Sequence, residues 1–284
     1  QCYSITVQYC VDKRLNIKTS LTFQFASHKT AVMINKTVLL FLLYLNANSA
    51  RDVDYCELSC NGIPNTVCKR KDYNCGPGPK CGSKFKIIKL TDAQKQLIVD
   101  QHNTFRNMVA IGEERRGDPG PQPSSAQMYA LSYNGELEYV VQCWLNSCEF
   151  AHDECRRTKN FTYVGQNLAL YQTTSRTDRV NITGQIKKMI TNWYDEVVDY
   201  PSNWTHFALP ESGKMIGHYT QLVWGRTKKI GCAMVRYKKG KWNVFYFGCN
   251  YGPGGNILHR IVYENGPPAY NCREEDPYYE GLCS

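Results

Sequence analysis

Hydrophobic side chains recur at helical spacing in three stretches of the chain. The first stretch begins at Thr91, where Thr91 and Gln94 have the spacing of a capping box, and Gly112 can end it. The second stretch covers 136–148, which contains no proline, and the third covers 185–198. Each places apolar residues on one side of a helix, so we predict three amphipathic helices.

The last third of the chain has the composition of strands. We predict strands over 219–224, 230–237 and 242–249, because these runs are short and rich in aromatic and β-branched residues. Helices that come first and antiparallel strands that follow are typical of an α+β domain, in which helices cover a sheet.

Two of these strands form a hairpin with a predictable register. Gly240 and Lys241 suit the central positions of a type II′ turn, because glycine adopts the positive φ that the first position requires. The register that this turn fixes places Cys232 opposite Cys249 at a non-hydrogen-bonded pair, where Cα atoms lie about 4.5 Å apart. That distance is within the range of a disulfide, so we predict a Cys232–Cys249 bond.

Composition narrows the class of protein. The chain has 284 residues, 42% hydrophobic and 21% charged, so we expect a packed core. Its net charge of +9 comes from lysines and arginines spread along the chain without a nucleic-acid motif, and we expect no nucleic-acid partner. Fourteen cysteines indicate folding in an oxidising compartment, which predicts a secreted, extracellular protein.

A secretory signal peptide is predicted over 33–50. Met33 and Lys36 supply a start and a positive charge, 38–45 is an apolar run, and Ala47-Asn48-Ser49 fits a cleavage site. The apolar run is too short to span a bilayer. We therefore expect the mature chain to begin near Ala50 or Arg51.

The residues before this signal peptide, 1–32, are interpreted as a non-native leader. They begin with Gln, and their removal deletes Cys2 and Cys10. Fourteen cysteines less two leaves twelve, an even number that suits a fully bridged secreted domain.

A cysteine-rich segment, 51–89, follows the signal peptide. It has little periodicity, and it contains no histidine that would favour a zinc finger. A segment of this kind has no core of its own, so we expect disulfides to join it to the main domain.

Four motifs identify a resemblance to a known family. The segments 217–224 (GHYTQLVW) and 246–256 (YFGCNYGPGGN) resemble the two signatures of the CAP superfamily. The segments 116–123 (RGDPGPQP) and 102–106 (HNTFR) resemble its insect branch, the venom allergen 5 or antigen 5 proteins. The resemblance runs from about residue 55 to 263 and implies a CAP domain over 90–264, with a cysteine-containing tail over 265–284.

The resemblance implies an α-β-α sandwich and a central cavity with two histidines and two acids. The histidines match His152 and His218, and one acid matches Glu196. The position of the second acid holds Gln166, within Gly-Gln-Asn rather than Gly-Glu-Asn, so the cavity has lost one negative charge. Two neutral imidazoles and waters could hold Zn²⁺, although we expect no required cofactor.

The same resemblance implies further disulfides. It pairs Cys148 with either Cys75 or Cys81, and leaves the other of these two for Cys143. The remaining implied pairs are Cys56–Cys68, Cys60–Cys155 and Cys272–Cys283.

Other motifs concern the surface of the protein. Arg116-Gly117-Asp118 is an integrin-type tripeptide in a proline-rich loop, and its Asp can instead simply begin the turn into Pro119. Asn160, Asn181 and Asn203 begin glycosylation sequons.

These observations together predict a non-enzymatic, monomeric venom or salivary protein, an allergen that acts on host proteins and meets IgE. One alternative is an integrin-binding platelet antagonist that uses Arg116, Gly117 and Asp118. Another is a metal-dependent hydrolase, such as a zinc protease, that uses His152, His218 and Glu196, with catalysis hindered because Gln166 has no useful pKa. A lipid ligand is a further possibility.

Overall fold

The described part of the chain falls into two units of contacts, Gln1–Val53 and Asp54–Ser284. In the first unit, the computed structural model describes the backbone of three strands and Val53. In the second unit it describes all residues except Ser83, Thr205, Glu211 and Ser212. The predicted signal peptide, 33–50, and its cleavage site lie outside the described residues. Among the described residues, the structure has no helix long and apolar enough to cross a membrane.

The first unit contains a small antiparallel sheet within the predicted leader. Its strands follow the order β1-β2-β3. Their bounds are β1 Ile5–Cys10, β2 Lys18–Phe25 and β3 His28–Val32. The origin of residues 1–32 stays a prediction, as does the finer division of the second unit at residues 89 and 264.

The second unit is built on one sheet with the antiparallel order β4-β8-β9-β7, and β6 pairs with β8 in parallel. A second, two-stranded sheet joins β5 to β10. The bounds are β4 Lys86–Ile88, β5 Ser125–Gln127, β6 Ser132–Tyr133, β7 Gly165–Thr173, β8 Lys229–Lys239, β9 Trp242–Gly252 and β10 Glu264–Asn265.

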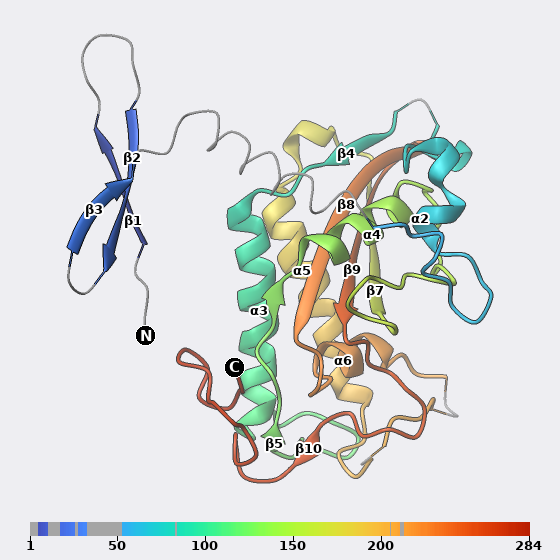
Figure 1. Ribbon diagram of the computed structural model, residues 1–284. Helices are drawn as coiled ribbons and strands as arrows, with labels where there is room; N and C mark the ends of the chain where they lie inside the picture. Colours follow the sequence, from blue (N-terminus) through green and yellow to red (C-terminus); the bar gives the residue numbers. More distant parts are fainter. Residues whose placement is uncertain are drawn as a thin grey trace. The chain divides into compact units, whose positions relative to one another are not determined.

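Helices cover both faces of the main sheet, as Figure 1 shows. The α-helices are α2 Thr66–Lys69, α3 Asp92–Ala110, α4 Gly135–Leu145, α5 Ile182–Asp195 and α6 Gly217–Leu222. The 3₁₀ helices are η1 Lys71–Tyr73, η2 Pro79–Cys81, η3 Thr177–Arg179 and η4 Glu196–Asp199. Helices α3, α5 and α6 share a core with one face of the sheet and α4 packs on the other, so the fold is the expected α-β-α sandwich.

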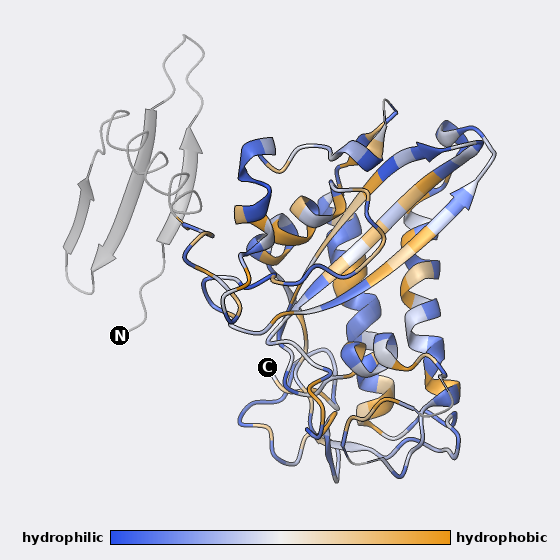
Figure 2. Cartoon of the chain, turned by 90° about the vertical axis from the view of Figure 1, so that its right-hand side faces the viewer, coloured by the Kyte–Doolittle hydropathy of each residue, from blue (hydrophilic) through white to orange (hydrophobic). Residues whose placement is uncertain are grey.

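Alternation along β9 separates the two cores. Phe245 and Phe247 join the cluster that contains α3, α5 and α6, whereas Val244 and Tyr246 join the cluster that contains α4. Figure 2 shows hydrophobic positions along these strands and on the helices that flank them. Both faces of β9 are buried, which explains why its sequence is a nearly continuous apolar run.

Most of the predicted elements are present with shifted ends. The capping box of α3 forms as expected, with the Thr91 side chain accepting from the Gln94 backbone and the Gln94 side chain accepting from the Thr91 backbone. Helix α4 ends at Leu145 rather than Cys148, and α5 begins at Ile182 because the Asn181 side chain caps it. The hairpin register is also confirmed, because Cys232 pairs with Cys249 across β8 and β9.

The predicted strand over 219–224 is wrong, because this segment lies mostly in helix α6. Its aromatic and β-branched residues favour a strand by composition alone. The structure overrides that preference by burying nearly every side of the short helix, with Tyr219, Leu222 and Val223 each 0% exposed. A carboxylate from a distant part of the chain, Glu196, accepts hydrogen bonds from the first turn of the helix.

Six disulfides hold the second unit. Three of them join the cysteine-rich segment to the rest of the unit, as expected of a segment without a core. In the pairing that the sequence left open, Cys81 bonds to Cys148 and Cys75 to Cys143. The others are Cys56–Cys68, Cys60–Cys155, Cys232–Cys249 and Cys272–Cys283.

Candidate functional site

The first half of the candidate site is His218 at the start of α6. Glu196 is the first residue of η4, and its Oε1 accepts a hydrogen bond from Nδ1 of His218, with 2.6 Å between the two atoms. Its other oxygen accepts the backbone N–H groups of His218 at 2.8 Å and Tyr219 at 3.2 Å. The carboxylate of Glu196 therefore caps the helix and orients the imidazole at the same time.

Packing also fixes the His218 ring. The indole of Trp193, on α5, stacks against the imidazole with 6.0 Å between ring centroids, and it stacks on Phe247 of β9 on the sheet side. The side chains of His218 and Glu196 are 19% and 13% exposed. Solvent therefore reaches this pair only in part, and its geometry is set by buried neighbours.

The second half of the site is His152, in the loop that follows α4. Its Nδ1 lies 2.7 Å from Oε1 of Gln166, on β7. The amide oxygen can only accept, so Nδ1 carries the proton and Nε2 has the lone pair. Strand β7 can place Gln166 here because Gly165, the residue before it, has no side chain and lets the strand lie close to the Gln221 side chain. A Cβ at Gly165 would lie 1.8 Å from Oε1 of Gln221.

A buried acid that the sequence analysis missed lies behind Gln166. The Gln166 amide nitrogen donates to Oδ1 of Asp153 at 3.0 Å and to Oδ1 of Asn250 at 3.1 Å. Gln166 and Asn250 are opposite each other in the β7–β9 pairing. Both amide hydrogens of Gln166 are therefore used, and its side chain is fixed in one orientation.

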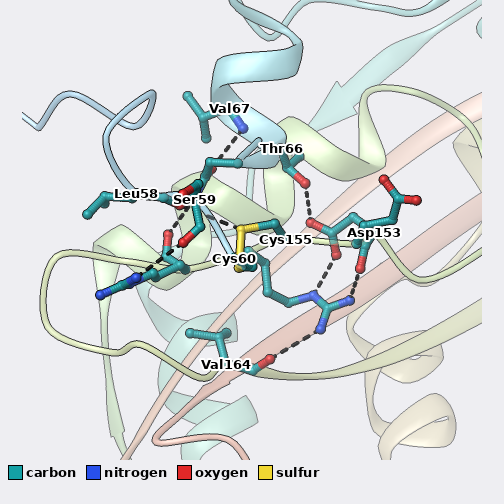
Figure 3. The surroundings of a disulfide bond; sticks show 12 residues. Leu58, Ser59, Cys60, Thr66, Val67, Asp153, Cys155 and Val164 are labelled. Atoms are coloured by element: carbon teal, nitrogen blue, oxygen red, sulfur yellow. Dashed lines mark hydrogen bonds and ion pairs between the residues drawn. A yellow bond between two sulfur atoms is a disulfide. The ribbon is translucent and has the colours of Figure 1, made fainter. Parts of the chain in front are cut away.

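Asp153 belongs to a network that surrounds a disulfide. Its carboxylate accepts from the Thr66 hydroxyl and from Nε of Arg156, each at 2.5 Å, and only 2% of the Asp153 side chain is exposed. Arg156 also donates to the backbone oxygen of Val164. Figure 3 shows Thr66 and Asp153 turned toward each other beside the Cys60–Cys155 bond. The cysteine-rich segment thus supplies a hydrogen-bond donor, the Thr66 hydroxyl, to Asp153, which in turn accepts from Gln166.

The pKa of His152 is lowered from its ordinary value. The main cause is desolvation of the ring against the protein, and the charges of Arg156 and of His218 lower it further. The hydrogen bond with Gln166 and the charge of Asp153 act in the opposite direction. The lowered pKa favours the neutral imidazole.

The donor atoms suit a divalent metal only in part. The Nδ1 atoms of His152 and His218 both face oxygens, which directs Nε2 of each ring outward as a ligand atom. Zinc prefers three or four protein ligands, and the described residues contain no group of three His, Cys, Asp or Glu side chains that could hold a metal. The described residues thus offer two imidazole nitrogens to a metal, and water would have to complete its coordination.

The chemistry open to this site is limited by the same contacts. A general base must accept a proton from a water or substrate, and the Glu196 carboxylate already accepts three hydrogen bonds. Gln166, in the place of the second acid, cannot titrate. The arrangement orients two imidazoles, and among the described residues only the Glu196 carboxylate forms a hydrogen bond with either ring.

The Arg-Gly-Asp loop lies apart from these contacts and is held by the body of the protein. Arg116 binds both oxygens of the buried Glu114 and also Asp195, and its guanidinium lies 5.2 Å from the ring centroid of Tyr194. The Asp118 side chain is 67% exposed and pairs with Lys214 at 3.1 Å. The loop therefore presents Asp118 at the surface while Arg116 supports the fold.

The asparagines of all three sequons lie at the surface. Asn160, Asn181 and Asn203 are exposed, and Oδ1 of Asn181 also accepts from the backbone of Gly184 at the start of α5. Thr205, which completes the third sequon, lies outside the described residues. Glycosylation at these positions stays a prediction.

Comparison with known proteins shows the family of this chain. Residues 99–251, more than half of the chain, match the family model described as CAP: Cysteine-rich secretory protein family. The chain belongs to the CAP family. His152, Gln166, Glu196 and His218 all lie inside the matched region, and their role in a shared cavity stays a prediction.

CAP relatives of high similarity are venom proteins of insects. The chain is 39% identical over 228 residues to Venom allergen 5.02 of Dolichovespula maculata, which covers 78% of this chain and 98% of that protein. It is 43% identical over 215 residues to a Venom allergen 3 homolog of Dinoponera quadriceps, which covers 74% and 89%. The chain is thus similar to the antigen 5 group within the CAP family.

Solved CAP structures confirm the fold. The structure of NaASP2 with Zn²⁺ has a TM-score of 0.57 and 27% identity, and it covers 69% of this chain and 97% of that one. BmVAL-1 has the same TM-score with 26% identity, and it covers 72% and 97%.

The site includes residues that the sequence analysis did not single out. Asn250 lies inside the second CAP signature, so the motif could have indicated it, and Asp153 directly follows His152. No local pattern shows that the Asp153 side chain turns inward to Arg156, because that pairing depends on the fold of the loop. Glu114 likewise shows its role only through its contacts with Arg116 and Tyr194.

Proposed function

We propose that this protein is a secreted, non-enzymatic antigen 5-like protein that acts on a host as a venom or salivary component. Venom allergen relatives at about 40% identity support this role. Six disulfides suit an oxidising, extracellular environment. Recognition by IgE in a sensitised host is part of the same proposal.

One observation carries the non-enzymatic part of the proposal. The carboxylate of Glu196 is occupied by His218 and by the first backbone groups of α6, and an amide stands where a second acid would be needed. A hydrolase at this site would have to break the helix cap to free its base. We infer that Glu196 maintains the shape of the site instead.

Two measurements test this proposal. Mass spectrometry of saliva or venom beside haemolymph should find the protein in the secretion, with an N-terminal peptide that starts near Arg51. A peptide-library digestion with added zinc should show no cleavage above that of His218→Ala. Presence in haemolymph alone would remove the host-directed role, and cleavage that is lost both with a chelator and with His218→Ala would establish the hydrolase alternative.

Metal binding at the two imidazoles is a separate proposal. His152 and His218 would hold a zinc ion, which would supply a Lewis acid, and Gln166 and Glu196 would keep the two rings in place. Calorimetry with ZnCl₂ should give one site that is lost in both His152→Ala and His218→Ala. Equal affinity of these variants and the wild type would contradict the proposal.

The exposure of Asp118 keeps an integrin-binding function as a second candidate. Integrin ligands use a carboxylate that reaches a metal in the receptor, and Asp118 is exposed, whereas Arg116 is engaged by Glu114. Inhibition of platelet aggregation that is lost in Asp118→Ala and retained in Asp72→Ala would support this candidate. Equal inhibition by all three proteins, or none, would exclude it.

A further inference from the structure

A cavity of about 530 Å³ lies away from the two histidines, between α3 and the C-terminal tail. Residues of α3 form one wall, β6 and Leu131 form a second, and the tail residues Asp276, Tyr278 and Tyr279 form the third. Figure 1 shows the C-terminus beside α3. The volume suits a small organic ligand.

The tail wall is firmly attached to the domain. The Cys272–Cys283 disulfide closes the tail on itself, and the Cys283 backbone donates to Met128 and accepts from Ala130. The backbone of Gly281 donates to Oδ1 of Asn107, on α3, at 2.8 Å. This wall lies beyond the residues that match the CAP family, 99–251, so it adds to the domain a surface that the matched region lacks.

The charge of the cavity is opposite to that of the protein. Its charged lining residues are Asp100 and Asp276, both acidic, in a chain whose net charge is +9. One oxygen of Asp100 accepts from Gln96 at 2.8 Å. One oxygen of Asp276 accepts the backbone N–H groups of Tyr278 and Tyr279, so each carboxylate uses only one of its two oxygens in these contacts.

The two carboxylates act on the same phenol. The pKa of Tyr279 is raised first by burial and next by the charge of Asp100, and Asp276 raises it further. Both acids therefore lie near Tyr279, from opposite walls of the cavity. A positive group beside this phenol would therefore be attracted by both carboxylates.

Aromatic and apolar surface completes the cavity. Tyr133, Tyr278 and Tyr279 contribute three rings, and Val99 and Leu131, at 7% and 3% exposed, form an apolar floor. Tyrosine faces attract ammonium groups, and the Tyr133 ring already has the ammonium of Lys95 at 5.2 Å from its centroid. The lining therefore combines charge attraction for a cation with contact area for an apolar body.

We propose that this cavity binds a small organic ammonium ion with an aromatic body. The ammonium lies between Asp100 and Asp276, and the aromatic body lies against Tyr133 and Leu131. Lys229 favours this orientation, because it donates to the Ser132 hydroxyl at 2.6 Å and places a positive charge on the β6 side. A calcium ion fits less well, since it requires six to eight oxygen ligands and most of this lining is ring and apolar surface.

Calorimetry on the purified full-length protein tests the proposal with tryptamine and its neutral analogue indole-3-ethanol. Tryptamine should bind about tenfold more tightly than the alcohol, because only the amine forms charge-assisted hydrogen bonds with the carboxylates. Asp100→Asn and Asp276→Asn should each weaken tryptamine binding about tenfold and leave the alcohol unchanged. Asp72→Asn, which removes an exposed acid of the cysteine-rich segment, should change neither affinity.

A further variant separates loss of the site from loss of the fold. Tyr278 is 87% exposed, so Tyr278→Ala leaves the core intact and should weaken both probes about threefold by removing one ring. Near-UV circular dichroism checks that all variants keep the native packing. Absent tryptamine binding, equal affinities for the two probes, or wild-type affinity in both Asp→Asn variants would overturn the proposal.

Discussion

The two imidazoles of the candidate site share one contact, an oxygen at Nδ1, and differ in the residues that support it. Nδ1 of His218 faces a carboxylate at 2.6 Å, and Nδ1 of His152 faces an amide oxygen at 2.7 Å. Behind the amide of Gln166 lies the buried Asp153, which is paired with Arg156. On the His152 side the negative charge, that of Asp153, therefore acts on the ring through the Gln166 amide. It is also neutralised by the ion pair with Arg156.

This difference separates orientation from charge. Both rings are oriented with Nε2 outward, which requires only an acceptor at Nδ1. A carboxylate on both sides would in addition supply a base and a stronger ligand field. Both rings are oriented in this protein. The second carboxylate, that of Asp153, pairs with Arg156 and does not bind an imidazole.

The largest expected effect comes from Asp153→Ala. It leaves Nε of Arg156, the Thr66 hydroxyl and one amide hydrogen of Gln166 without their acceptor, and breaking a buried pair costs about 3 kcal/mol. Urea unfolding should show this loss, with Asp72→Ala near the wild type. A loss below about 1 kcal/mol would mean that the network contributes little to stability.

Removal of the other support should cost somewhat less. Glu196→Ala deletes the acceptor of two backbone N–H groups of α6 and of His218, for a loss of about 2 kcal/mol in the free energy of unfolding. Glu196→Gln, which keeps one oxygen, should lose about half as much. The same urea experiment measures both, and Glu57→Ala serves as an exposed control. Equal losses in the two variants would contradict the capping role.

An acid at residue 166 should give both imidazoles a carboxylate at Nδ1 and should lower the free energy of unfolding. In the wild type, the Gln166 amide nitrogen donates to Oδ1 of Asp153 and to Oδ1 of Asn250. In Gln166→Glu a carboxylate oxygen faces these two acceptors instead. Burial beside another acid raises the pKa of the new carboxyl in the folded state. The protonated carboxyl can still donate one hydrogen bond, so the variant should approach wild-type stability near pH 4. It should lose about 2 kcal/mol as the pH rises from the unfolded-state pKa through the raised folded-state pKa. Urea unfolding at pH 4.5 and pH 8 measures the difference, and a pH-independent loss would contradict this explanation.

The smallest effect concerns the titration of His152. Its pKa should lie below 6.5, because desolvation and the positive charge of Arg156 disfavour the charged ring. Since the folded-state pKa is the lower one, the stability that this group contributes is complete above the unfolded-state pKa and is lost as the pH falls through the folded-state pKa. NMR titration of the ring protons measures the pKa, and Gln166→Glu should raise it. A wild-type value above 6.5 would contradict the electrostatic description.

Local rules predicted the elements whose determinants are close together in the sequence. The Thr91 capping box and the turn at Gly240 each depend on a few adjacent residues, and the turn in turn fixed the pairing of Cys232 with Cys249. Helix α6 was missed because its acceptor, Glu196, is 22 residues away from His218. Burial on almost every side also removes the periodicity by which a helix is recognised.

The candidate site was predicted from motifs, and its supports were not. His152, His218, Glu196 and Gln166 followed from the resemblance to CAP proteins. Asp153 escaped detection because its partners, Thr66 and Gln166, come from two distant segments that meet only in the folded chain.

The disulfides of the cysteine-rich segment have a consequence for proteolysis. A cut between Arg70 and Lys71 would not release the piece before it, because Cys60 is bonded to Cys155. The new chain end after the cut would stay on the domain, because Cys75 and Cys81 are bonded to α4 and to the turn that follows it. In a fluid rich in digestive enzymes, such a nicked molecule would keep its mass and its outer surface until a reductant separated the fragments.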